Sequence, residues 1–517
     1  MHLWVWLTAS TQKKHSRTIA QVASHQGHGD RVCSIFETPH SSATDRRVEW
    51  KRVHRFNGLK MRRWFFLPLC MALASCMSAP QDVSSRAATP VQTSLPAMKT
   101  FGGSRPTSPD RSNRDMARDF LELAFQLESG RELKQFSRFE GPIAIQVTGN
   151  PPPTLMPDLN RLVNRLRNEA GLDIARRKPS GPNQSVITIE VVSRADIRRF
   201  LPKAACFVVP NVSSLREYRS ARHTAQTNWS TLTRRTQIAI FLPGDAAPQE
   251  VRDCLHEELA QALGPLNDLY RLPDSVFNDD NVHTVLTGFD MLILRAYYSP
   301  ELQSGMTRAQ VAERIPGILS RLNPRGNAVA SRNTPKTPRS WIRAIQTALG
   351  PDTNPSQRRR AAADALRIAQ NQGWTDHRLG FSHFALARLS QVAQPDVAFQ
   401  NFVAAELAYR RAPGTRLHQA YSASQLAAYA ISQGEGNDAL ILLNPHIATA
   451  EKFENAALLS TLLMLRAEAL AQIGRSAEAN LVRMDSLAWA RYGFGTQWAV
   501  RARLREISAL SPANQTQ

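Results

Sequence analysis

The chain has 517 residues, and its 64 Lys and Arg against 43 Asp and Glu give a net charge of +21 at neutral pH. Such a length allows about three domains and a sizeable core. The basic doublets are scattered through the sequence and form no single stripe, so no nucleic-acid partner is predicted. The charge instead predicts a solvated basic surface, with attraction to anionic lipid or acidic envelope polymers as the alternative.

Residues 61–75 have the order of a secretion signal, in which basic residues precede an apolar stretch. Met61-Arg62-Arg63 is followed by mostly apolar residues, and the segment leads into Leu73-Ala74-Ser75-Cys76, which resembles the bacterial lipobox. A signal of this kind works only near the start of a nascent chain. We therefore predict a lipoprotein signal peptide over residues 61–75, and we interpret residues 1–60 as an artefact of start-site choice that precedes the true start at Met61.

Cys76 is the predicted lipidation site. The apolar stretch before it is too short to cross a bilayer, which takes ~20 residues, whereas acyl chains on Cys76 would together give a stable membrane anchor. Met77 and Ser78 lack the aspartate that retains many lipoproteins in the inner membrane. The expected location is therefore the cell envelope, at the periplasmic face of the outer membrane. Residues 76–111 are rich in Ser, Pro and Thr, which predicts a flexible tether.

Residues 112–310 mix predicted helices and strands, so an α+β domain is expected. Helical spacing of apolar residues covers 115–133 and 154–170. Runs rich in β-branched and apolar residues predict strands at 143–147, 186–192, 205–210 and 237–242. A further helix begins at Pro248 and ends near Gly264, because proline favours the first turn of a helix and glycine its end.

This last helix carries the most informative motif of the chain. Zinc proteases of the metzincin type read H-E-x-x-H-x-x-G-x-x-H, in which histidines bind zinc and the glutamate activates water. The residues that align with this pattern are Glu257, Glu258, Gln261, Gly264 and Asn267. The general-base glutamate and the glycine are present, whereas a carboxylate and two amides replace the three imidazoles. A register that begins at His256 fails, because Ala260 would be the second ligand.

Two further motifs follow in the metzincin order. Ser275-Val276-Phe277-Asn278-Asp279 stands where metzincins have a methionine turn, and Leu286-Thr287-Gly288-Phe289-Asp290 leads into an apolar helix. A segment from Tyr298-Ser299-Pro300 to Gly305-Met306 comes next. Together with Glu257 to Asp268, these motifs resemble bacterial lipoproteins that carry domain of unknown function 2927. The resemblance covers roughly residues 112–310 and brings no established activity; with the zinc-protease pattern it implies a degenerate metzincin-like domain, a mixed sheet plus the motif helix.

The polar residues of the motif can face a common cleft, because Glu257 and Gln261 are four residues apart. The predicted ligand-binding residues are Glu257, Gln261, Asn267 and Asp268. One carboxylate with amides suits zinc poorly, so no metal site and no cofactor are predicted. Calcium would need further oxygen ligands, which nearby aspartates such as Asp274, Asp279 and Asp280 could supply. His256 lies about 100° around the helix from Glu257 and is expected to face another surface, and His283 is expected to be a loop residue.

Three interpretations of this cleft remain open. The motif residues can be hydrogen-bonded parts of an inherited scaffold, or they can bind an envelope protein, a peptide or a glycan. The third is a peptidase-like hydrolase in which Glu258 is the general base beside a non-standard metal site. We favour an inactive, protease-like binding module.

Cys206 and Cys254 are the only cysteines after Cys76. Two cysteines in one domain commonly pair in an oxidising compartment, so a disulfide is predicted, with two buried thiols as the alternative.

The C-terminal part differs in pattern from the rest. Residues 311–340 show little periodicity and are predicted to be a connector. Residues 341–511 are alanine-rich and helical in pattern, and Gln433–Ala439 aligns with Ile473–Ala479 at a spacing of forty residues. This repeat predicts an all-α, tetratricopeptide-like solenoid, with an irregular helical bundle as the alternative. Solenoids usually offer a concave face to an extended partner, so this part favours binding over catalysis.

Overall fold

The computed structural model describes residues 95–103, 107–178, 184–351 and 353–512. The predicted extension, the signal peptide and Cys76 lie outside these residues. The described residues all belong to one compact unit. Within them, no helix is both long enough and apolar enough to cross a membrane.

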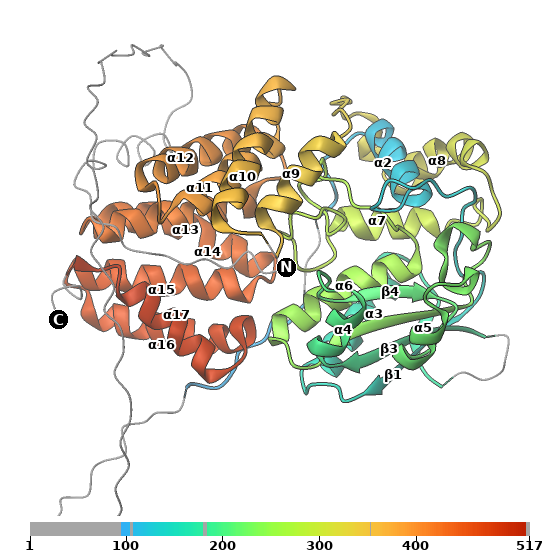
Figure 1. Cartoon of the computed structure of the whole chain (residues 1–517), viewed down its shortest axis with the longest axis horizontal. Helices are drawn as coiled ribbons and strands as arrows, with labels where there is room; N and C mark the ends of the chain where they lie inside the picture. The colour runs from blue at the N-terminus through green and yellow to red at the C-terminus, as the bar shows by residue number, and fades with distance from the viewer. Residues whose placement is uncertain (1–94, 104–106, 179–183, 352, 513–517) are drawn as a thin grey trace, which may run out of the picture. The chain divides into compact units, whose positions relative to one another are not determined.

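Five strands form one mixed sheet in the described N-terminal half (Figure 1). Its order is β2 (Ile174–Arg176), β1 (Ile143–Gly149), β3 (Ser185–Val192), β5 (Gln237–Pro243) and β4 (Phe207–Pro210). β2, β1, β3 and β5 run parallel, and β4 pairs antiparallel with β5 at the edge. The predicted mixed sheet is therefore present. The sequence did not reveal β2, because three residues are too few to show a period.

Helices cover both faces of this sheet. α3 (Leu155–Glu169) and α6 (Pro248–Leu263) pack with Ile187, Ile189 and Ile240 in the main core. On the other face, α4 (Arg194–Phe200) and α5 (Leu215–Ala221) pack with Ala239 and Phe241 of β5. Successive side chains of a strand point to opposite faces, so β5 contributes to both cores. α6, which carries the motif, is thus an inner helix.

α2 (Asn113–Phe125), α7 (Gly288–Tyr297) and α8 (Arg308–Leu322) extend the main core. α8 corrects the predicted connector over 311–340, whose first part is a regular helix. Val311, Ile315 and Leu319 recur at helical spacing and are buried, and α8 packs against α2. A capping box at Thr307 begins the helix. Pro316 lies within this helix. Because proline usually ends a helix, the sequence did not predict a helix from the apolar spacing here.

The C-terminal half is entirely helical where the structure describes it. Its helices are α9 (Arg339–Leu349), α10 (Pro355–Asn371), α11 (His377–Ser390), α12 (Pro395–Arg411), α13 (Arg416–Ser432), α14 (Gly436–Lys452), α15 (Ala456–Gln472), α16 (Ser476–Phe494) and α17 (Gln497–Ser508). α13, α14 and α15 each have 17 residues. Gly434 and Gly474 have φ of 80° and 81°, which permits a sharp turn after α13 and after α15. The repeat spacing of forty residues therefore corresponds to the length of one helix pair with its turns.

The predicted flexible tether is wrong at its C-terminal end, because residues 95–103 pack against α16. Phe101 is buried and stacks on Trp489, with 4.5 Å between ring centroids. The Lys99 backbone N–H donates to the Ala488 carbonyl at 3.1 Å. The aromatic contact and this hydrogen bond hold the segment, although its composition is that of a linker.

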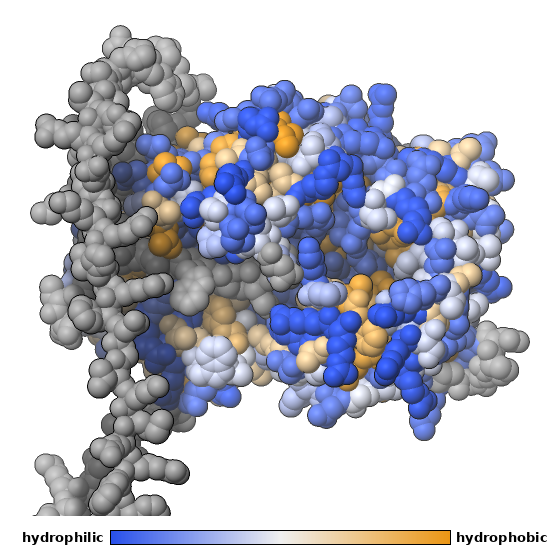
Figure 2. Space-filling model, viewed as in Figure 1, coloured by the Kyte–Doolittle hydropathy of each residue, from blue (hydrophilic) through white to orange (hydrophobic). Residues whose placement is uncertain are grey.

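The face drawn in Figure 2 is mostly hydrophilic, and its apolar residues lie in several separate patches. This agrees with the solvated surface that the scattered charges predict.

Candidate functional site

The motif helix α6 is anchored at its C-terminal end by Arg235. This side chain is buried, and its Nη1 donates to the carbonyls of Gln261 at 2.6 Å and Ala262 at 2.8 Å, while Nη2 donates to that of Gly264 at 2.5 Å. A guanidinium at this position satisfies carbonyls that have no partner within the helix and complements the helix dipole. The sequence showed Arg235 only as one of many basic doublets.

Gly264 is needed for close packing and not for a left-handed turn. Its φ is −171°, which any residue can adopt. A Cβ at this position would come within 2.9 Å of the Tyr297 ring. The motif glycine therefore lets α7 approach the end of α6.

Five carboxylates gather beside α6. They are Glu257 and Glu258 on the helix, Asp268 and Asp279 in the loop that follows, and Glu128 after α2. Glu258 is buried, Glu257 and Asp268 are partly buried, and Glu128 and Asp279 reach the surface. The acidic cluster therefore extends from the interior to solvent.

The surroundings disfavour the ionised form of these carboxylates. Desolvation by the protein, and then repulsion from Glu128 and Asp279, raise the pKa of Glu257 to about 8. The pKa of Glu128 rises to about 7 through desolvation and the charge of Asp279. Burial and neighbouring carboxylates raise the pKa of Glu258 and of Asp268 well above the ordinary value. Protons or a bound cationic group would relieve this repulsion.

Few hydrogen bonds satisfy the acidic cluster. Gln261 donates to Glu128 at 3.3 Å between Nε2 and Oε1, and the Tyr270 hydroxyl donates to Asp279 at 2.7 Å. Glu258 Oε2 and Asp268 Oδ1 are buried and have no hydrogen-bond partner within the described ranges. Buried polar atoms usually have a partner, so these two oxygens are acceptors that a ligand or a proton could satisfy.

A cavity of about 80 Å³ opens beside Glu257 and Asp279. Other polar residues that line it are Gln249, Glu250, Asp253, Asn278, Asn281, His283, Thr284 and Tyr421. Gln249, Asp253 and Glu257 are four residues apart, so they share one side of α6. Tyr421 comes from α13, so the helical half completes the wall. We call this the acidic pocket.

The structure joins Cys206 and Cys254 in a disulfide, the pairing that their number predicted. Both cysteines line the acidic pocket. The bond ties the segment before β4 to the middle of α6.

The predicted cleft residues do not all meet. Glu257 and Asp268 belong to the acidic cluster, and Gln261 donates to its member Glu128, whereas the Asn267 amide donates to the Glu122 carbonyl at 3.1 Å. Asp279, the last residue of the Ser275–Asp279 motif and a possible calcium ligand in the sequence, also belongs to this cluster. The distant Glu128 was missed, since no local pattern relates it to α6.

The S-x-F-N-D and L-T-G-F-D motifs hold the loop together. Asp290 is fully buried and accepts hydrogen bonds from the Ser275 hydroxyl, the Val276 N–H and the Thr287 N–H. Burial raises the pKa of Asp290 to about 6 in spite of these bonds. Phe277, at the centre of the first motif, is also fully buried. Ser275, Thr287 and Asp290 thus shape the loop, whereas Val276, Asn278 and Asp279 of the first motif line the acidic pocket.

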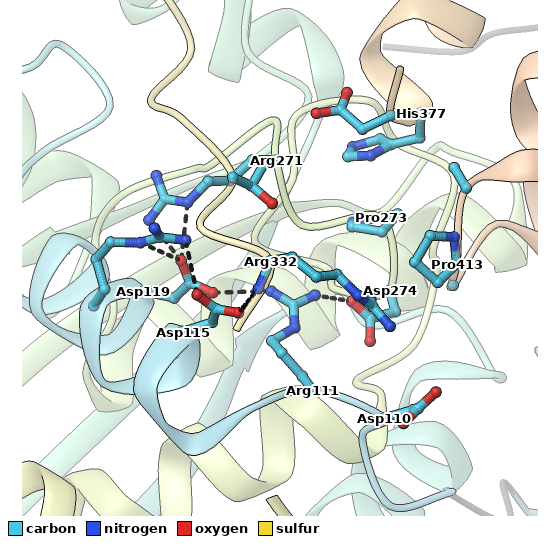
Figure 3. A pocket seen from close by; sticks show the side chains of 15 residues that line it. Asp110, Arg111, Asp115, Asp119, Arg271, Pro273, Asp274, Arg332, His377 and Pro413 are labelled. Carbon is cyan, nitrogen blue, oxygen red and sulfur yellow. Dashed lines mark hydrogen bonds and ion pairs between the residues drawn. The ribbon is translucent and has the colours of Figure 1, made fainter. Parts of the chain in front are cut away.

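A second pocket, of about 110 Å³, lies where the loop, α2 and the helical half meet (Figure 3). Its buried charges have charged partners. Arg111 pairs with Asp119 and Asp274, and Arg271 pairs with Asp119 and with Glu122 at 2.7 Å. A network that satisfies itself in this way ties the elements together and leaves little capacity for a ligand.

No group of three or more His, Cys, Asp or Glu side chains has a geometry that could hold a metal ion, within the part of the chain that the structure describes. His283 lies in the loop, as expected, and its Nε2 contacts the Pro273 carbonyl at 3.0 Å.

Fold and site define an α+β domain whose motif helix is covered by a helical domain. Within this chain, residues 113–317 match the family model described as "Protein of unknown function (DUF2927)". The matched segment contains α2, the sheet, α6 and most of α8. No curated protein and no solved structure matches the chain.

Proposed function

We propose that this protein is a binding module whose acidic pocket holds a cationic group of a peptide, such as a lysine or arginine side chain. The observation that carries the proposal is the wall of the acidic pocket, where Asp253, Glu257 and Asp279 face one cavity and Asp253 Oδ1 is a buried acceptor without a hydrogen-bond partner among the described residues. An ammonium or guanidinium group would donate hydrogen bonds to carboxylates and remove their mutual repulsion.

The state of Glu258 favours binding over hydrolysis. A general base must be ionised to accept a proton. Burial and the charges of Glu257 and Glu128 hold the pKa of Glu258 well above its ordinary range, which disfavours the ionised form that a general base needs. Glu258, which aligns with the general-base glutamate of the zinc-protease pattern, is therefore poorly suited to that role.

Fluorescence anisotropy with labelled tetralysine tests the proposal on the full-length protein. We expect saturable binding in spite of the protein's positive net charge, and a loss of roughly tenfold in affinity in Glu257→Gln or Asp279→Asn, because each removes a charge-assisted contact. Glu313→Gln is the control, since Glu313 is 81% exposed on α8. Binding that is absent, or equal in Glu257→Gln and wild type, would overturn the proposal.

The affinity should also rise with pH. A cation selects ionised carboxylates, so protons must leave Glu128, near pH 7, and Glu257, near pH 8, when it binds. We expect tighter binding at pH 9 than at pH 6. The hydrolase alternative would replace the proposal if the protein cleaved the peptide and Glu258→Gln abolished the cleavage.

We propose further that Cys76 anchors this module at the periplasmic face of the outer membrane, where the helical half supports a scaffolding role. The lipobox-like sequence carries this proposal. Cys76→Ala should move the protein from the membrane fraction to the soluble fraction, and mass spectrometry of the native protein should find no peptide from before Met61.

A further inference from the structure

A different side of α6 faces a cavity of about 190 Å³. Arg161 and Arg165 line it from α3, and Arg252 and His256 line it from α6. The residues of each pair are four apart and so share one side of their helix. Glu454, in the turn between α14 and α15, completes the wall. We call this the arginine pocket.

Two of these arginines keep an unused donor. Arg165 pairs with Glu169 through Nε at 2.8 Å and Nη2 at 3.0 Å, which leaves Nη1. Arg252 binds the Glu454 carboxylate through Nη1 and the Glu454 carbonyl through Nη2, which leaves Nε. Neither Arg165 Nη1 nor Arg252 Nε has a hydrogen-bond partner among the described residues. Buried guanidinium N–H groups without acceptors are costly, so an acceptor ligand is favoured here.

His256 presents a further donor in a defined tautomer. The Leu286 N–H donates to its Nδ1 at 3.1 Å, so a neutral ring carries its proton on Nε2. Burial, and then the positive charges of Arg252, Arg165 and Arg161, lower the pKa of His256 well below its ordinary value. The ring is therefore neutral, and it lies in a positive environment.

The acids that line the arginine pocket are already engaged. Asp158 pairs with Arg161 and accepts a hydrogen bond from the Tyr492 hydroxyl at 2.7 Å. Glu454 binds Arg252, and its Oε1 is a buried acceptor without a partner within the described ranges. The ligand must therefore be rich in acceptors, and a hydroxyl on it could satisfy Glu454.

We propose that the arginine pocket binds a phosphoryl group. A tetrahedral phosphate offers several anionic oxygens, so it can accept from guanidinium groups on both helices and from an imidazole N–H at the same time. A monoprotonated phosphate also carries a hydroxyl that can donate a hydrogen bond to Glu454. Because α3, α6 and the turn before α15 all line the pocket, the bound group links the sheet domain to the helical half.

Thermal unfolding and calorimetry of the full-length protein with sodium phosphate, against sodium chloride at equal ionic strength, test this site. Phosphate should raise the unfolding temperature of the wild type. Arg165→Gln should weaken phosphate binding roughly tenfold, the loss expected for one charge-assisted contact. Arg167→Gln is the matched control, because Arg167 lies on α3 but is exposed outside the pocket, and it should bind as the wild type does.

Equal phosphate binding in wild type and Arg165→Gln, or an equal loss in Arg167→Gln, would overturn the proposal. If Arg165→Gln fails to fold, Arg161→Gln is measured instead and must show the loss. Sedimentation with phosphatidylcholine vesicles, with and without phosphatidylglycerol, separates the two sources of the phosphoryl group. Binding to anionic vesicles that Arg165→Gln abolishes identifies a lipid headgroup, whereas binding of free phosphate alone identifies a soluble source.

Discussion

The two pockets beside α6 differ in how their charges are balanced. In the acidic pocket, Glu257 is surrounded by other carboxylates that raise its pKa. In the arginine pocket, Arg161, Arg165 and Arg252 each pair with a carboxylate of their own. The residues Asp253 and Glu257 on one side, and Arg252 and His256 on the other, are sequence neighbours. One helix thus separates a cluster of unpaired carboxyl groups with raised pKa values from a region of paired charges.

This difference distinguishes the two kinds of buried charge. The Arg252–Glu454 pair stabilises the contact between the halves, because removal of one partner leaves the other buried and alone. Clustered carboxylates destabilise the fold, which suggests that they are retained for a ligand. Opposite effects on stability are therefore expected from mutations on the two sides.

The largest effect is expected from Arg252→Met. Its guanidinium is almost fully buried, pairs with Glu454 and lies over the rings of Phe101 and Tyr492. The variant should lose about 3–5 kcal/mol of unfolding free energy, because the Glu454 carboxylate remains buried without a partner. Urea denaturation measures the change. Adding Glu454→Gln should restore part of the loss, and a change below about 0.5 kcal/mol in Arg252→Met would contradict the assignment.

Loss of the disulfide should act on the acidic pocket. Cys254→Ser together with Cys206→Ser removes the tie between the segment before β4 and α6, at a cost of about 2–4 kcal/mol. Tetralysine binding should weaken, while phosphate binding at the arginine pocket should persist. If phosphate binding disappeared as well, the two pockets would not be independent.

The smallest effect, and of opposite sign, is expected from Glu257→Gln. The pKa of Glu257 is about 8 in the folded protein and near 4.3 in an unfolded chain. Between these two pKa values, Glu257 keeps its proton in the folded protein and has lost it in the unfolded chain. The contribution of this proton to the free energy of unfolding is therefore complete below the unfolded pKa and is lost as the pH rises through 8.

At pH 9 the variant should therefore be more stable than the wild type by on the order of 1–2 kcal/mol, and the difference should shrink toward pH 4. Glu313→Gln should show no such pH dependence. A Glu257→Gln variant that is less stable at pH 9 would show that the carboxylate is favourably paired.

Local patterns in the sequence predicted much of the fold. The run from Pro248 to Gly264 is the helix α6, and the strands β1, β3, β4 and β5 lie where β-branched residues predicted them. Such patterns reflect local propensity and the burial of one face. The prediction failed at α8, where Pro316 interrupts the pattern, and at residues 95–103, where Phe101 packs against a distant helix.

The candidate site was only partly predictable. The motif located Glu257, Gln261 and Asp268, since their spacing follows from the helix and the turn after it. Glu128 and Tyr421 reach the same region from distant parts of the chain, and no periodicity relates them to α6. Asn267 matched a ligand position, but it hydrogen-bonds the Glu122 carbonyl, because tertiary packing offered its amide a nearer acceptor.

The sequence by itself determined which residues α6 carries and on which side each one lies, because the helical period sets their angles around the axis. The helical period alone places His256 and Glu257 on different sides of α6. Only the tertiary structure decided what each side meets: carboxylates of two loops on one, arginines of α3 and a turn of the helical half on the other. The pKa of a side chain depends on burial and on charges brought close by folding, and neither can be read from neighbours in the sequence.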